Sequence, residues 1–213
     1  MLFTHPLNYL FFKYIYLQKK MMNLIFATHN INKFNEIKSQ MPQHIHLLSL
    51  SDLNYNKNIP EPFESLEENA AIKANTIHRE FNKNCFSDDT GLFVSALGGA
   101  PGVFSARYAG EKASTLDNIN KLLTALEQKE DRSAYFKTVI VLKIDSNTHY
   151  FEGVVKGYIA KKIAGTNGFG YDPVFVPEGY KTSFAQLPLL TKHKIGHRGK
   201  AINALIEFLK TNI

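Results

Sequence analysis

Two kinds of hydrophobic periodicity divide this chain into expected strands and helices. Short apolar runs at residues 24–27 and 174–176 predict buried strands. Two longer segments, 134–144 and 149–163, are rich in β-branched and aromatic residues, and the turn-forming residues 145–147 lie between them. This pattern predicts a long antiparallel hairpin.

Four other stretches carry apolar residues at helical spacing, which predicts one buried face on each helix. They are residues 34–41, 66–81, 115–128 and 200–210. Ser65, with Glu68 three residues later, is expected to cap the second of these helices, and Thr115 is expected to cap the third. Within the hairpin, Gly153 and Gly157 indicate bulges or the close approach of another backbone.

A pair of adjacent carboxylates, Asp88 and Asp89, follows the apolar residues Cys85 and Phe86. We expect a short strand to end at these acids and Gly91 to form a turn with unusual backbone angles. Because side chains alternate along a strand, the two carboxylates are expected to point to opposite sides. Acid pairs at strand ends hold hard cations through oxygen ligands, but a solvated Asp-Asp turn has the same sequence. These residues alone leave both interpretations open.

Polar residues 28–33 follow the first expected strand and precede the first expected helix. Thr28 or Asn30 is expected to cap that helix. Backbone N–H groups and the helix dipole at such a terminus favour an anion, and Lys33 adds a positive charge. The segment therefore predicts a phosphate seat, while an ordinary capped helix is the alternative.

Three further groups have both a binding and a structural interpretation. Asn69 and Lys73, four residues apart on a helix, are expected to reach the same place. Arg107 follows a glycine-rich loop and is either a partner for an anion or a salt-bridge residue. Phe169 and Tyr171 lie next to glycines and form either a stacking face for a purine or a packed aromatic loop.

The composition of the chain bounds the size of the domain and the redox compartment in which the protein works. The chain has 213 residues, of which 44% are hydrophobic and 21% are charged, which suits one domain with a sizeable core. Its one cysteine, Cys85, excludes an internal disulfide and is expected to pack in the core of a protein from a reducing compartment.

The net charge of +6 is concentrated partly at the N-terminus. Residues 1–21 contain three lysines and no acid, so the remainder has 22 basic and 19 acidic residues, a net of +3. Such an excess of positive charge suits a small substrate that carries phosphate groups as well as a nucleic-acid polymer. The apolar runs in residues 1–21 are interrupted by Lys13 and too short for a membrane span. We therefore expect a dispensable extension or an upstream start site at 1–21, and a single working domain at 22–213.

Six motifs occur in one order along the chain. They are Thr28-x-Asn30-x-x-Lys33, Glu68-Asn69-Ala70-x-x-Lys73-Ala74, Ser87-Asp88-Asp89-Thr90-Gly91-Leu92, Pro101-Gly102-Val103-Phe104-Ser105-Ala106-Arg107-Tyr108, Gly168-Phe169-Gly170-Tyr171-Asp172-Pro173 and His197-Arg198-Gly199-x-Ala201. Together they strongly resemble the inosine/xanthosine triphosphate pyrophosphatase family, from Asn23 to the C-terminal helix.

The resemblance implies an α/β fold with a long, curved mixed sheet, flanked by helices in two lobes with an active-site cleft between them. It also implies a homodimeric, cytoplasmic, Mg²⁺-dependent enzyme with no nucleic-acid or membrane partner. The implied reaction is hydrolysis of deaminated purine triphosphates, such as ITP, dITP and XTP, to the monophosphate and pyrophosphate, which keeps damaged bases out of DNA and RNA.

The resemblance also implies roles for individual residues. Asp89 is expected to be the proton acceptor, and Asp89 and Glu61 the Mg²⁺ ligands. Asp88 is expected to raise the pKa of a proton shared with Asp89 and to help hold the ion. Lys33 and Lys73 complete the expected catalytic set. The expected substrate-binding residues are Thr28, His29, Asn30, Ile31, Asn32, Lys33, Thr90, Arg107, Phe169, Gly170, Tyr171, Asp172, Lys192, His197 and Arg198.

Four positions depart from the family pattern. Thr90 replaces a usual Ser, Phe104 a Tyr, Gln186 a Glu, and Gly196 the Ser of a Ser-His-Arg triplet at the base pocket. The base preference is therefore open, and a related pyrophosphatase with another base preference is one alternative. A nucleotide-binding or nucleic-acid-binding protein without turnover is another. The intact acid pair and lysines argue against it, because binding alone needs neither a metal nor a base.

Overall fold

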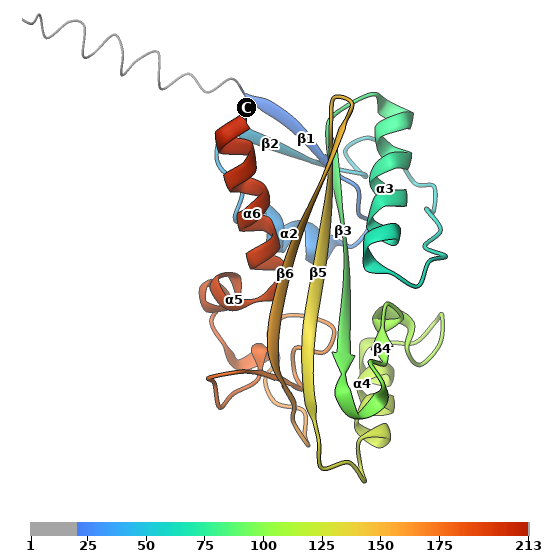
Figure 1. Cartoon of the computed structure of the whole chain (residues 1–213), viewed down its shortest axis with the longest axis vertical. Helices are drawn as coiled ribbons and strands as arrows, with labels where there is room; N and C mark the ends of the chain where they lie inside the picture. The colour runs from blue at the N-terminus through green and yellow to red at the C-terminus, as the bar shows by residue number, and fades with distance from the viewer. Residues whose placement is uncertain (1–20, 213) are drawn as a thin grey trace, which may run out of the picture.

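The computed structural model describes residues 21–212, so the expected extension lies outside the described residues except for Met21. One seven-stranded mixed sheet forms the centre of the fold (Figure 1). Its strand order is β2-β1-β3-β5-β6-β7, and β4 pairs with β3. The strands are β1 (Met22–Phe26), β2 (Ile45–Ser49), β3 (Cys85–Val94), β4 (Pro101–Gly102), β5 (Ser133–Ile144), β6 (Asn147–Ile159) and β7 (Phe175–Pro177). The β1 pairs are parallel, and all the others are antiparallel.

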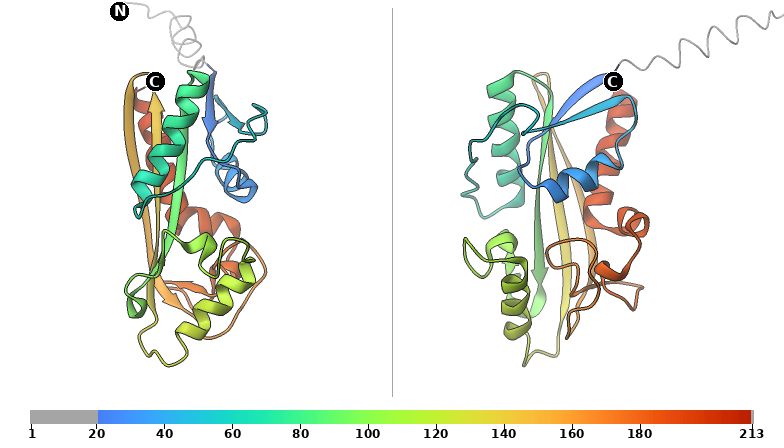
Figure 2. Two further views of the ribbon diagram at one scale, coloured as in Figure 1. Left: turned by 90° about the vertical axis from the view of Figure 1, so that its right-hand side faces the viewer. Right: turned by 180° about the vertical axis from the view of Figure 1, so that it is seen from behind.

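Helices cover both faces of this sheet (Figure 2). They are α2 (Ile31–Lys38), α3 (Leu66–Phe81), α4 (Thr115–Ala125), α5 (Leu189–Ile195) and α6 (His197–Asn212), with short 3₁₀ turns η1 (Ser95–Leu97), η2 (Ser105–Arg107) and η3 (Phe184–Gln186). Val139 and Val141 pack with α3, whereas Ile140 and Leu142 pack with α6. Because neighbours on a strand point to opposite faces, α3 and α6 lie on opposite sides of β5.

Two separate hydrophobic clusters give the molecule its two lobes. One surrounds Phe86 and the apolar face of α6, and the other surrounds Leu92 and the apolar face of α4. β3 passes through both, so Asp88, Asp89 and Thr90 lie between the two cores. The expected sheet, flanking helices and lobes are thus confirmed.

The acid pair lies inside a strand, so the predicted strand end at these residues is wrong. β3 pairs with β1 only as far as Phe86 and meets β4 only from Leu92, while β5 pairs with its whole length. Gly91 pairs with Lys137 in this ladder and forms no turn. A Cβ at Gly91 would lie 2.7 Å from the carbonyl oxygen of Gly102, so glycine is needed here for close backbone approach.

The hairpin prediction is confirmed, although its second strand ends at Ile159 rather than at residue 163. The α3 boundaries are as predicted, with Ser65 as the cap, but several other helix boundaries differ from prediction. α2 runs from Ile31 to Lys38 rather than over 34–41, with Asn30, one of the two expected residues, as its cap. Ser114 rather than Thr115 caps α4, which ends at Ala125. α6 begins at residue 197 rather than 200, and α5 was not predicted. No helix within residues 21–212 is long and apolar enough to cross a lipid bilayer.

Gly153 on β6 lies directly against the first turn of α6. A Cβ there would overlap the carbonyl group of His197 and lie 2.7 Å from the backbone nitrogen of Ala201. The expectation of close backbone approach is therefore confirmed at this residue.

We predict that Gly153→Ala destabilises the fold by about 1–3 kcal/mol, because α6 must shift away from the sheet. Chemical denaturation followed by circular dichroism would measure the loss. Gly179→Ala is a control for the added methyl group, since nothing lies within 4 Å of a Cβ there, although its φ of +82° adds local strain. If Gly153→Ala is no less stable than the wild type, the close approach is not a packing constraint.

Candidate active site

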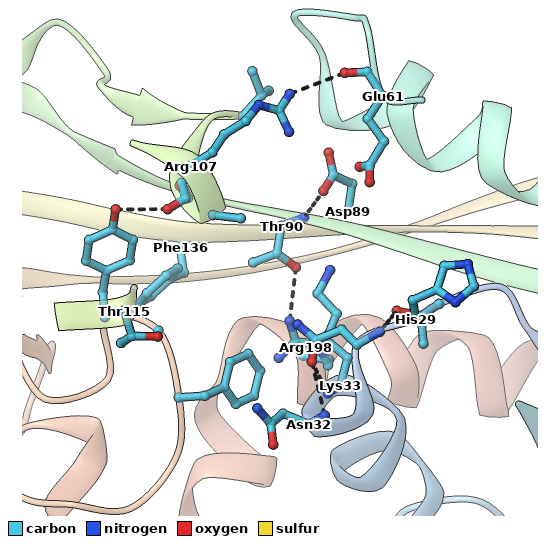
Figure 3. A pocket seen from close by; sticks show the side chains of 18 of the residues that line it. His29, Asn32, Lys33, Glu61, Asp89, Thr90, Arg107, Thr115, Phe136 and Arg198 are labelled. Carbon is cyan, nitrogen blue, oxygen red and sulfur yellow. Dashed lines mark hydrogen bonds between the residues drawn. The ribbon is translucent and has the colours of Figure 1, made fainter. Parts of the chain in front are cut away.

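A pocket of about 460 Å³ lies between the two lobes at the open edge of β3 (Figure 3). Its lining comes from the 27–33 turn, the 58–61 loop, η2 and the 169–172 turn, from strands β3 and β5, and from helices α3, α4, α5 and α6. Every site residue expected from the sequence lines it except Ile31, whose side chain is exposed, and Asp88, which is buried.

The turn before α2 is ordered by its own side chains. Asn30 Oδ1 accepts hydrogen bonds from the backbone N–H groups of Asn32 and Lys33 at 3.0 and 3.1 Å, and Thr28 Oγ1 accepts one from the N–H of Asn30. The cap thus occupies two of the N–H groups that a phosphate would otherwise use. The attraction for an anion comes from the helix dipole and from the Lys33 ammonium.

One face of β3 holds a buried ionic network centred on Asp88. Lys33 Nζ donates to Asp88 Oδ1 at 3.0 Å, and Arg198 Nε donates to Asp88 Oδ2 at 3.2 Å. The same guanidinium donates to Glu36 Oε2 at 2.8 Å and to Thr90 Oγ1 at 3.2 Å. Burial would raise the pKa of Asp88, but Lys33 and Arg198 outweigh it and hold the pKa well below its usual range. Asp88 therefore stays ionised beneath the pocket.

The opposite face of β3 carries Asp89, so the predicted divergence of the two acids is confirmed. Lys73 Nζ donates to Glu61 Oε2 at 2.8 Å and lies 3.9 Å from Asp89 Oδ1. Asp89 Oδ1 accepts the N–H of Thr90, but Asp89 Oδ2 is buried and has no hydrogen-bond partner among the described residues.

Burial raises the pKa of Asp89, with the negative charge of Glu61 adding to it and the lysines Lys73 and Lys33 opposing it. Asp88, which was expected to raise this pKa, is not among the main causes of the shift. Instead, the two carboxylates have opposite pKa shifts because Asp88 is paired with cations and Asp89 is largely buried without a hydrogen bond to Oδ2.

Asn69 and Lys73 reach the same loop, as expected from their spacing. The Asn69 side chain accepts the N–H of Phe63 and donates to its carbonyl oxygen, while Lys73 holds Glu61. Arg107 approaches this loop from η2 and donates to the Glu61 carbonyl oxygen at 3.3 Å. It also pairs with the exposed Glu111 at 3.4 Å, which supports the salt-bridge interpretation, while its place in the pocket lining keeps the anion-partner role a prediction.

The carboxylates of Asp89 and Glu61 suit a hard divalent cation. Across residues 21–212 no group of three or more His, Cys, Asp and Glu side chains could hold a metal. A cation here would therefore bind one or two carboxylates and complete its shell with water and phosphate oxygens, as Mg²⁺ commonly does. The unpartnered Asp89 Oδ2 fits this arrangement.

The far end of the pocket combines cations with aromatic faces. Lys192 Nζ donates to Asp172 Oδ2 at 2.7 Å, and the same oxygen accepts the N–H of Phe169. The Lys192 ammonium and the Arg198 guanidinium lie 5.0 and 5.3 Å from the centre of the Phe169 ring. His197 is buried against Phe136, and its Nδ1 has no partner among the described residues.

Glu36 is the main residue that the sequence analysis missed. It is buried on α2, one helical turn after Lys33, and binds Arg198 while lying 3.7 Å from Lys192. An acid three residues after a proposed phosphate lysine was a usable signal, because both lie on one side of a helix.

The departures from the family pattern mostly lie outside the pocket. Gln186 caps a turn through Ser183, and Phe104 is exposed beneath the Arg107 guanidinium. Gly196 joins α5 to α6, and a Cβ there would lie 2.5 Å from the carbonyl oxygen of Lys192. Thr90 keeps a hydroxyl group in the pocket, where it bonds to Thr138 and Arg198.

Comparison with known proteins gives consistent matches over nearly the whole described chain. A sequence model of the Ham1 family matches residues 24–208. A dITP/XTP pyrophosphatase from Christiangramia forsetii is 52% identical over 188 residues, covering 88% of this chain and 99% of the relative. The solved Ham1 protein of Staphylococcus aureus has a TM-score of 0.82 and 40% identity, covering 90% of this chain and all of that one. The HAM1 protein from Coxiella burnetii has the same TM-score and coverage at 35% identity.

We predict that Glu36→Gln lowers the free energy of unfolding by about 3 kcal/mol, because it removes one partner of the buried pair with Arg198. Urea denaturation measures the change. Glu207→Gln is the matched control, since Glu207 pairs with Lys210 on the exposed side of α6 and should lose at most about 0.5 kcal/mol. Equal losses in the two variants would show that the Arg198 pair is no more important than a surface pair.

Proposed function

The chain belongs to the Ham1 family, and from this we propose that it hydrolyses deaminated purine nucleoside triphosphates, such as ITP, dITP and XTP, to the monophosphate and pyrophosphate. The observation that carries the proposal is the split environment of the acid pair. The Asp89 carboxylate, with its Oδ2 unpartnered and the Lys73 ammonium 3.9 Å from its Oδ1, lies in a pocket whose far end holds aromatic rings and buried cations. Removing deaminated nucleotides from the pool would prevent their incorporation into DNA and RNA.

In this proposal Asp89 is the general base that takes a proton from the attacking water. Its Oδ2 is free to accept that proton, and its raised pKa brings it closer to the pH at which a base works well. Lys33 and the start of α2 bind the triphosphate, and Lys73 stabilises the negative charge that develops during attack. Mg²⁺, held by Asp89 and Glu61, would supply charge neutralisation at the phosphate oxygens.

Selectivity would come from donors at the base end. Lys192, His197 and Arg198 carry N–H groups there, and Phe169 offers a ring on which a purine can stack. A purine 6-oxo group accepts hydrogen bonds from such donors, whereas the 6-amino group of adenine would leave them unpaired. Gly196 adjoins His197 and replaces the usual Ser of the triplet at the base pocket. The second candidate function is therefore a related nucleotide pyrophosphatase with a different base preference.

We also propose a cytoplasmic homodimer that uses the open face of β5 and β6. Tyr135, Tyr150 and Tyr158 are exposed, and the β5–β6 register places them on one face of the sheet. α3 covers β3 and β5 on that face and leaves most of β6 uncovered. Clustered exposed rings are typical of protein interfaces. The free, buried Cys85 agrees with a reducing compartment.

The central test is pyrophosphate release by the full chain with Mg²⁺, comparing dITP and XTP with dATP, dGTP, dCTP and dTTP. We expect kcat/KM for dITP and XTP to exceed the value for dATP at least 100-fold, because unpaired buried donors penalise adenine. Comparable release from an ordinary nucleotide would support the second candidate. No release from any of the six would contradict an enzymatic function.

Asp89→Asn is the control that assigns the chemistry. The variant should lose at least 100-fold in kcat while keeping nucleotide affinity, measured without Mg²⁺, within about threefold, because it removes the base and one metal ligand but no residue proposed to bind the nucleotide itself. Unchanged turnover would exclude Asp89 from the mechanism.

For the dimer, we expect light scattering to give twice the mass of one chain for the wild type. Tyr150→Asp should weaken association at least tenfold by placing a charge in the proposed interface. Leu190→Asp, at an exposed residue on α5, should leave association unchanged. A monomeric wild type would contradict the proposal.

A further inference from the structure

We propose that in the nucleotide-free protein the Lys73 ammonium occupies the position between Glu61 and Asp89 that a divalent cation takes during turnover. Pairing of Lys73 and binding of the cation then exclude one another. This inference rests on the proposed function, because it concerns the same two carboxylates. It adds that Lys73 determines when the cation can bind.

The geometry of Lys73 carries the inference. Its Nζ lies 2.8 Å from Glu61 Oε2 and 3.9 Å from Asp89 Oδ1, so its positive charge already offsets part of the charge of the two carboxylates expected to hold the metal. Lys73 is buried on α3, whereas the Glu61 side chain is 31% exposed on a loop. The ammonium is therefore held between its own helix and the two carboxylates.

The second lysine of the pocket has a different partner. Lys33 Nζ bonds to Asp88 at 3.0 Å, on the opposite face of β3, and its charge acts on Asp89 only through space, without a hydrogen bond or ion pair to Asp89 or Glu61. Both lysines carry one positive charge into the same pocket, but only Lys73 lies beside both Glu61 and Asp89. Replacing Lys33 is therefore a matched control for replacing Lys73.

Simple electrostatics explains the exclusion. An ammonium and a dication within about 4 Å of the same carboxylate oxygens would repel strongly in a partly buried site. A cation therefore has to displace Lys73 from Glu61, and the released ammonium needs another anion. A bound triphosphate supplies that anion, so the cation is expected to bind weakly alone and tightly together with the nucleotide.

The test measures Mn²⁺ binding to the nucleotide-free full chain by electron paramagnetic resonance, which does not depend on catalysis. Lys73→Met should bind Mn²⁺ at least tenfold more tightly than the wild type, because it frees both carboxylates. Lys33→Met removes the same charge from the same pocket and should gain less than threefold. If Lys73→Met does not fold, as judged by circular dichroism, Lys73→Gln replaces it.

Equal gains in the two lysine variants would overturn the inference, since they would reflect only the net charge of the pocket. No gain, or a loss, in Lys73→Met would overturn it as well. These outcomes are distinguishable from failure of the proposed function, which is measured as pyrophosphate release by the wild type. An active wild type with no gain in Lys73→Met would contradict this inference alone.

Discussion

The central constraint of this structure is the interrupted pairing along one edge of β3. β1 pairs with β3 only as far as Phe86, and β4 joins it only at Leu92. Strand β5 holds the other edge throughout, so β3 stays extended across the gap. The gap separates two hydrophobic clusters and forms the floor of the pocket. An acid pair can therefore occupy the middle of a long buried strand.

The alternation of side chains along β3 separates two carboxylates that are adjacent in sequence. Asp88 points into a network with Lys33 and Arg198 that keeps it ionised, and Asp89 points to a face where one of its oxygens is unpaired. The same residue type thus has a lowered pKa on one face and a raised pKa on the other. Opposed pKa values in neighbouring acids are a pattern expected where one acid is structural and the other reactive.

Helix α2 links the two ends of the pocket. Its first turn carries Lys33, and its next turn carries Glu36, which holds Arg198 and lies near Lys192. A buried ion pair of this kind contributes little net stability compared with apolar packing, but removing one partner is costly. We therefore propose that the network fixes the orientation of the cations at the proposed base end of the pocket.

Local sequence determined the hairpin and the Ser65-capped helix, because capping, periodicity and turn chemistry act over a few residues. Most candidate site residues were assigned through the family resemblance that the six motifs carry. The six motifs likewise determined the family and the expected fold. Only the tertiary structure decided that β3 continues through the acids, because that depends on pairing with β5, far along the chain. It also decided that Asp88 is paired below the pocket, that Glu36 reaches Arg198, and that Lys73 lies between Glu61 and Asp89. The partners that determine these roles lie 12 to 162 positions apart in the sequence, so no local pattern specifies the pairs.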